Sequence, residues 1–167
     1  MPRWPDPPLA DEAITLRPWR ESDIPAQLAA FRDPVFQRHS DWAPLTEADA
    51  LAALHTDSQV DLAIVADRVA GGVSLHSFVD GRAGIGYWLA PDARGRGFAT
   101  RAVRLLSRWA FDELGIARLE LTCGPDNVAS QRVAERCGFV REGLLRSHLP
   151  FKGGRRDSVL YSLLPSD

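Results

Sequence analysis

Several residue types and patterns are scarce in this chain of 167 residues, and each scarcity excludes a class of protein. There are two cysteines, Cys123 and Cys137, which are too few for a disulfide scaffold or for a metal site of their own. We interpret both as buried free thiols and expect no metal. No run approaches the ~20 apolar residues that a membrane-spanning helix needs, and residues 1–12 lack the apolar core of a signal peptide. We therefore expect a cytoplasmic protein with no membrane partner.

Lysine is almost missing: Lys152 is the single example, and arginine carries nearly all of the positive charge. The formal net charge of −2 does not favour nucleic acid as a partner of the whole protein. The charge is unevenly distributed, however. Residues 1–92 contain 7 Arg and 14 Asp+Glu, which gives −7, whereas residues 93–167 contain 13 Lys+Arg and 8 Asp+Glu, which gives +5. This asymmetry is consistent with an anion site in the second half, and a solvated arginine-rich surface is the alternative.

The remaining composition, 45% hydrophobic and 25% charged, is typical of one globular domain. We expect residues 1–12, rich in proline, to form a flexible arm and residues 13–167 to form a single domain. Alternating and apolar patterns predict seven strands, at 13–19, 61–67, 68–80, 82–90, 117–123, 139–149 and 156–164. Helical spacing predicts helices at 21–31, 46–55, 97–114 and 128–137. This order predicts a mixed α/β (α+β) fold, and it is not the strict alternation of a doubly wound sheet.

Residues with known terminal preferences mark the ends of these elements. Ser22 or Asp23 is placed to cap the first helix, Thr46 with Asp49 to open the second, and Asn127 to cap the last. Gly115 and Gly138 follow the last two helices as C-terminal caps. We also expect Gly71-Gly72 and the segment 80–84 to form the turns between the central strands.

The stretch "ARGRGFATRAVRLL" (93–106) raises the main question, because arginines stand where a helix begins. The start of a helix is positive, so cations there are unfavourable unless an anion is bound. The stretch has no Gly-Lys-Ser/Thr of a P-loop, and Thr100 stands where a dinucleotide fingerprint needs glycine or alanine. Glycines at such a turn let backbone N–H groups approach phosphate oxygens closely. A pyrophosphate is therefore the favoured ligand, and an ordinary turn with solvated arginines is the alternative.

Five motifs in the same order resemble the GCN5-related N-acetyltransferases (GNAT), over about residues 14–164. Arg94-Gly95-Arg96-Gly97-Phe98-Ala99 fits the Arg/Gln-x-x-Gly-x-Gly/Ala signature of that family. "GYWLAP" (86–91) and Asn127-Val-Ala-Ser130 before "ERCGFVREG" (135–143) are also similar to it. "LRPWRESD" (16–23) and "GRRDSVLYSLL" (154–164) resemble the branch with the ribosomal-protein alanine N-acetyltransferases.

The resemblance implies a GNAT fold, with a mostly antiparallel sheet of about six or seven strands and an acyl-CoA cleft between two splayed central strands. It implies acetyl-CoA as acyl donor and transfer to a primary amine, a protein N-terminus or a small molecule, in a ternary complex. An N–H of Leu89 or Ala90 would bind the developing oxyanion. The residues implied in cofactor binding are Trp88, Leu89, Ala90, Arg94, Gly95, Arg96, Gly97, Phe98, Ala99, Thr100 and Asn127.

Two residues are candidates for the chemistry that the resemblance implies. In the ribosomal-protein branch the serine matching Ser130 protonates the leaving thiolate, and Ala134 stands where many relatives have a tyrosine for that role. Glu120 matches the strand position of the general base in some N-terminal acetyltransferases, and an ion-pair role is its alternative. His76, His148 and Asp157 are further candidates for the base.

Two other functions remain open from the sequence alone. An acyl-CoA-binding module would keep the turn at 94–100 but transfer nothing. A nucleic-acid-binding domain would use the arginines from Arg94 to Arg108, but no reading motif or interleaved exposed aromatic residue supports it. The acceptor is not specified, although the acidic first half suits a cationic amine. Members of the family often form homodimers, and no exposed apolar stripe in the sequence decides this.

Overall fold

A computed structural model describes residues 4–41, 45–54 and 58–167 and contains one eight-stranded mixed sheet. The spatial order is β1-β2-β3-β4-β5-β6-β8-β7, and every neighbouring pair is antiparallel except β5 and β6. The predicted mixed, mostly antiparallel sheet is thus confirmed, with one strand more than expected. The strands are β1 Leu9–Ala10, β2 Thr15–Pro18, β3 Val60–Val65, β4 Val69–Val79, β5 Arg82–Leu89, β6 Arg118–Cys123, β7 Val140–Phe151 and β8 Gly154–Leu163.

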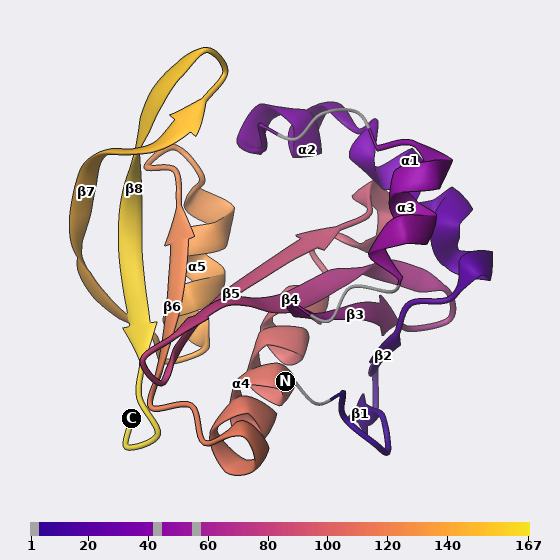
Figure 1. Cartoon of the computed structure of the whole chain (residues 1–167), viewed down its shortest axis with the longest axis horizontal. Helices are drawn as coiled ribbons and strands as arrows, with labels where there is room; N and C mark the ends of the chain where they lie inside the picture. Colours follow the sequence, from indigo (N-terminus) through magenta and orange to yellow (C-terminus); the bar gives the residue numbers. More distant parts are fainter. Residues whose placement is uncertain (1–3, 42–44, 55–57) are drawn as a thin grey trace.

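Five α-helices flank this sheet (Figure 1). Alternation along the strands separates its two faces, because successive side chains point to opposite sides. Helix α4 packs on β4 and β5 and against α5, whereas α1 packs on β4 from the other side and against α3. The helices are α1 Ile24–Phe31, α2 Pro34–His39, α3 Glu47–Ala53, α4 Phe98–Leu114 and α5 Val128–Arg136, and the short 3-10 turns are Glu21–Asp23 and Pro91–Ala93.

The main core lies between α4 and the sheet. Ala102, Val103 and Leu106 of α4 are fully buried in this core, where α4 contacts β4 and β5. Gly115 ends α4 in the left-handed conformation, with φ of +64°, as the sequence predicts. Within the described part of the chain, no helix is long and apolar enough to cross a membrane.

Gly71 and Gly72 differ from the expectation, since both lie inside β4 and not in a turn. The chain instead turns at residues 66–68, where the Ala66 N–H donates to the Arg68 carbonyl. A Cβ on Gly71 would come within 2.1 Å of the Trp88 carbonyl oxygen, and one on Gly72 within 2.7 Å of Trp88 Nε1. Any larger side chain at these two positions would collide with Trp88 of the neighbouring strand, so only glycine fits. The spacing of residues in the sequence does not reveal this contact.

The N-terminal segment also departs from the predicted flexible arm. Leu9 and Ala10 pair with β2, and Trp4 packs against the main core. A strand of two residues is too short to produce an alternating pattern, which is why composition suggested a loose segment. The first helix differs too: the Asp23 carboxylate does not cap α1 but accepts from the Arg17 guanidinium at 2.7 Å and from the Arg20 N–H.

Candidate active site

The glycine–arginine turn presents backbone N–H groups at the start of α4. Gly95 and Gly97 have φ of +74° and +80°, and no atom lies within 4 Å of the position a Cβ would take at either glycine. The first intrahelical bond of α4 is from the Arg101 N–H to the Gly97 carbonyl, at 3.1 Å. No side chain caps α4, and no acidic residue lies in its first turn. The turn thus leaves space and donors for an anion.

The arginines of this turn differ in their partners. Arg94 Nη2 lies 2.6 Å from Asp33 Oδ2 and 3.2 Å from the Leu89 carbonyl oxygen, so Arg94 joins the turn to the start of α2. Burial alone would raise the pKa of Asp33, but hydrogen bonds from Arg94 and the Phe36 N–H hold it below its ordinary value. Arg101 pairs with Asp11 and Glu12 of the N-terminal segment, at 2.9 and 2.6 Å.

Arg96 differs from Arg94 and Arg101 in its contacts. Its guanidinium lies 4.6 Å from the centre of the Phe98 ring and, among the described residues, makes no ion pair. Its charge is therefore available at the open side of the turn. The sequence could not separate Arg94 from Arg96, because the partner of Arg94 lies 61 positions away.

A gap opens between β5 and β6 directly before this turn (Figure 1). The two strands pair only from Arg82 to Gly84 and from Arg118 to Glu120. Beyond that point β6 continues in register with β8, and β5 continues with β4. The edge of β5 that faces β6 is therefore unpaired up to Leu89, which confirms the splayed central strands that the fold prediction expected.

The peptide groups at the end of β5 alternate in direction. The Ala90 N–H donates to the Ala70 carbonyl on the β4 side, at 2.8 Å, and is thereby engaged. Since neighbouring residues of a strand present their N–H groups to opposite edges, the Leu89 N–H faces the gap. Of the two expected oxyanion donors, only Leu89 is in position to donate.

Helix α5 borders the same gap on the α4 face. The Asn127 side chain accepts from the Ser130 N–H at 3.2 Å, which confirms the predicted cap. The Tyr87 side chain, from β5, lies near Ser130: burial raises the pKa of Tyr87 to about 12, and an interaction with the Ser130 hydroxyl opposes this rise. Cys123 also interacts with Ser130, and burial raises the pKa of its thiol. Cys123 and Cys137 are free cysteines, as expected, although Cys137 is only half-buried.

Comparisons with known proteins agree with this geometry. Residues 13–140 match the model of the acetyltransferase (GNAT) domain. The chain belongs to the GNAT family. YdaF of Bacillus subtilis, whose name describes a ribosomal N-acetyltransferase, is 42% identical over 96 residues, 56% of this chain and 52% of YdaF, so the chain matches about half the length of that relative. The N-acetyltransferase p20 of Bacillus licheniformis is 30% identical over 169 residues, 93% of this chain and 95% of p20.

A solved structure adds a bound cofactor to the comparison. The microcin C7 self-immunity acetyltransferase MccE, determined with acetyl-CoA and AMP, superimposes with a TM-score of 0.82 at 25% identity, over 92% of this chain and 93% of MccE. The GNAT fold of this chain thus occurs in a protein that holds acetyl-CoA.

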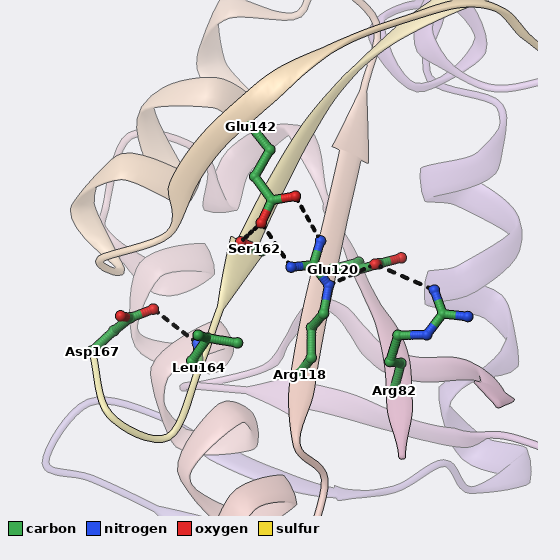
Figure 2. A network of polar contacts seen from close by, with 7 residues as sticks. All are labelled: Arg82, Arg118, Glu120, Glu142, Ser162, Leu164 and Asp167. Atoms are coloured by element: carbon green, nitrogen blue, oxygen red, sulfur yellow. Dashed lines mark hydrogen bonds and ion pairs between the residues drawn. The ribbon is translucent and has the colours of Figure 1, made fainter. Parts of the chain in front are cut away.

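In this GNAT domain the candidate base Glu120 is part of an ion-pair network at the vertex of the gap (Figure 2). Its Oε1 lies 2.8 Å from Arg118 Nε and 3.6 Å from Arg82 Nη1. Arg118 also donates to both oxygens of Glu142, at 2.7 and 2.8 Å, and Ser162 donates to the same carboxylate. These hydrogen bonds lower the pKa of Glu142 to about 2. The network joins β5, β6, β7 and β8 where the sheet begins to split.

The other candidate bases of the GNAT domain lie in two places. His148 Nδ1 lies 3.0 Å from Ser158 Oγ, and Asp157 accepts from the Ser147 N–H at 2.7 Å, so both are engaged within the β7–β8 hairpin. His76 lies on β4, where its ring covers Gly84 so closely that a Cβ there would come within 2.3 Å of His76 Cε1. Burial lowers the pKa of His76, which favours the neutral imidazole.

An aromatic cluster lies on the face of the sheet opposite α4, at the end of β5. Trp88 stacks on Trp19 with ring centres 5.8 Å apart and meets the edges of Phe31 and Phe36 at 5.2 and 6.4 Å. Trp88 and Trp19 belong to two of the motifs that resemble the family, whereas Phe31 and Phe36 belong to none. Helix α2, which carries Phe36, follows an Asp33-Pro34 start that could have indicated it in the sequence.

The tip of the β7–β8 hairpin contacts α2 and the residues that follow it (Figure 1). Lys152 Nζ donates to the Gln37 carbonyl at 2.6 Å, and the Lys152 N–H donates to Asp41 Oδ1 at 2.9 Å. Arg156 Nη1 donates to the His39 carbonyl at 3.3 Å. These contacts join residues more than 100 positions apart across the two halves of the sheet, so no local pattern predicts them.

Proposed function

We propose that the protein is an acetyl-CoA-dependent N-acetyltransferase that transfers the acetyl group to a primary amine by direct attack in a ternary complex. One observation carries the proposal: the gap between β5 and β6 ends at Leu89, and the open first turn of α4 begins nine residues later, at Phe98. A thioester in the gap and a pyrophosphate at the turn can then belong to one molecule. The family membership and the acetyl-CoA held by MccE support the same donor.

The residues proposed to hold the cofactor have separable tasks. The N–H groups of Phe98, Ala99 and Thr100 bind the pyrophosphate, with Gly95 and Gly97 giving access and Arg96 adding charge. The unpaired edge of β5 at Trp88–Ala90 pairs with the extended arm of the cofactor. Arg94 positions the turn through Asp33, and Asn127 positions Ser130 by capping α5.

The chemistry follows from the same placement. When bound, acetyl-CoA supplies an activated acetyl group. The N–C bond forms as the C–S bond breaks, while the Leu89 N–H donates to the carbonyl oxygen and the Ser130 hydroxyl gives its proton to the departing sulfur. The phenol of Tyr87, with a pKa of about 12, stays protonated beside Ser130.

The proton lost by the attacking amine requires a base on the face opposite α4. We assign this role to His76 ahead of Glu120, since the imidazole of His76 is neutral whereas Glu120 is shared by two guanidinium groups. Replacing each residue by glutamine separates the two assignments. We expect His76→Gln to remove the acidic limb of the pH–rate profile and Glu120→Gln to leave it in place. The reverse result would return the role to Glu120.

Calorimetry followed by a thiol-release screen tests the function. We expect acetyl-CoA to bind with a Kd of about 1–100 µM, within the usual range of substrate affinities. Coenzyme A release should then depend on a primary amine, tested with N-terminal peptides and with small amines. A chain that binds no acyl-CoA in this range would overturn the proposal. Binding without release for every amine would instead identify an acyl-CoA-binding module.

A further inference from the structure

A cavity lies on the face of the sheet opposite α4. Its volume is about 160 Å³, which is room for a small organic group and far more than the ~10–15 Å³ that one water needs. Two tryptophans belong to the lining, and Asp61 is the one charged residue among its described members. The lining residues are Trp4, Pro18, Trp19, Ala53, Leu54, Gln59 and Asp61.

The Asp61 carboxylate and the Trp19 indole are the polar groups of this cavity with few partners in the described part of the chain. None of the described residues forms an ion pair with Asp61. Burial raises the pKa of Asp61 to about 6, and only the Trp19 indole opposes the rise. Trp19 Nε1 is itself buried and makes no hydrogen bond of regular geometry in the described structure. A carboxyl group so placed costs stability unless a ligand compensates it.

We propose that Asp61, together with the Trp4 and Trp19 rings, forms a subsite for a second cationic group of the acceptor. A carboxylate beside aromatic faces is the chemistry that recognises an ammonium or guanidinium group, through an ion pair and cation–π contacts. Among the described lining residues there is one negative charge and no positive one, which favours a cation as the occupant. This inference rests on the proposed acetyl transfer to an amine.

The position of the cavity sets the distance to the reacting amine. Asp61 lies opposite Ser74 in the sheet, and Ser74 lies opposite Gly86 on β5. All three are half-buried, so small side chains cover the surface from Asp61 to the strand that borders the gap. Two strand spacings of about 4.8 Å separate Asp61 from Gly86, and Leu89 lies three residues further along β5 at about 3.3 Å each, so the backbone of Asp61 is roughly 14 Å from that of Leu89. Because the Asp61 side chain and its ion pair cover part of this distance, the acceptor class is a long amine with a second cation roughly 10–14 Å from the reacting nitrogen.

Two variants test the subsite on the full chain. Asp61→Asn removes the charge, and Asp67→Asn is the matched control, because Asp67 is exposed in the turn after β3 and outside the cavity lining. The substrates are a long α,ω-diamine (diaminooctane), a short one (diaminobutane) and the monoamine aminooctane. We expect Asp61→Asn to raise KM for diaminooctane about tenfold or more, with kcat within about twofold, since charged hydrogen bonds commonly have this value. The KM for aminooctane should not change, and Asp67→Asn should change neither.

A peptide series distinguishes the two sources of such a cation. Peptides with lysine or with norleucine at the third position are compared, and a loss of preference for lysine in Asp61→Asn would assign the subsite to peptide acceptors. Equal effects of Asp61→Asn on diamine and monoamine, or none on either, would overturn the proposal. Should Asp61→Asn not fold, Trp19→Phe, which removes the indole N–H, should still reduce the preference for the long diamine about threefold.

Equilibrium dialysis of diaminooctane separates this inference from the proposed function. If no amine is acetylated, the wild type should still bind the diamine more tightly than Asp61→Asn does. Absence of binding to the wild type, in a protein that does acetylate amines, would reject the subsite alone.

Discussion

The proposed donor and acceptor sides of the site are built in different ways. On the donor side, residues 94–100 offer glycines and backbone N–H groups to an anion, and Leu89 lies just before them. On the acceptor side the wall combines Trp19, Phe36 and Trp88 with the tip of a hairpin around Lys152. A backbone site must be continuous in sequence and so leaves a readable motif. A wall of side chains is assembled from distant segments: Phe36 and Lys152 lie outside any motif, and the motifs of Trp19 and Trp88 do not reveal that the two rings stack.

The largest expected effect concerns Ser130. Its proposed role as proton donor depends on a side chain, and it is the donor-side assignment with the least support from backbone geometry. We expect Ser130→Ala to lower kcat about 100-fold, the lower range for loss of a general acid, with little change in the affinity for acetyl-CoA. Helix α5 should persist, since Asn127 accepts from the backbone N–H of residue 130 and not from its hydroxyl. Steady-state kinetics with a good amine substrate measures the change.

Ser130→Thr is the control for this prediction, because it keeps a hydroxyl at the same position. It should retain most of the activity. An unchanged kcat in Ser130→Ala would move the proton donor elsewhere, and Tyr87 would then be the next residue to replace.

A pair of glycines tests whether backbone N–H groups of the turn bind the cofactor. Gly97 and Gly115 stand at the two ends of α4, both left-handed, and both with open space around an added Cβ. Alanine at either position should cost about 1 kcal/mol of stability through the same backbone strain. Only Gly97→Ala should weaken acetyl-CoA binding, by about 10- to 30-fold in calorimetry, because it tilts the N–H groups of the first turn. Equal binding losses in both variants would mean that helix stability, and not the turn, controls affinity.

The same contrast explains how far the sequence led. The seven predicted strands, the four predicted helices and the caps at Thr46 and Asn127 follow from local patterns, and the structure contains them. Gly71 and Gly72 were misplaced because their reason is Trp88, on a neighbouring strand. Strand β1 is too short to show a period, and the pairing of Arg94 with Asp33 depends on tertiary structure. The roles of Ser130, Glu120 and the turn residues remain predictions.

The smallest expected effect concerns Asp61 on the acceptor side. Removing its charge should increase the stability of the folded protein, whereas most substitutions decrease it. The pKa of Asp61 is about 6 in the folded protein, above the 3.8 of an ordinary aspartate, so the folded state binds this proton more tightly than the unfolded chain does. Its contribution to stability is present below about pH 4 and is lost as the pH rises through 6. Asp61→Asn should therefore stabilise the protein by about 1 kcal/mol at pH 8 and leave stability unchanged at pH 4.

Urea unfolding of the variant and the wild type at both pH values measures this difference, with the exposed Asp67→Asn expected to change neither. A gain confined to pH 8 would mean that the chain keeps the half-buried Asp61 carboxylate at a cost to its own stability, as ligand sites commonly do. A loss at pH 8 would mean that the Asp61 carboxylate supports the fold through Trp19. In that case the main role of Asp61 would be to hold the Trp19 ring in place, and recognition of a cation would be secondary.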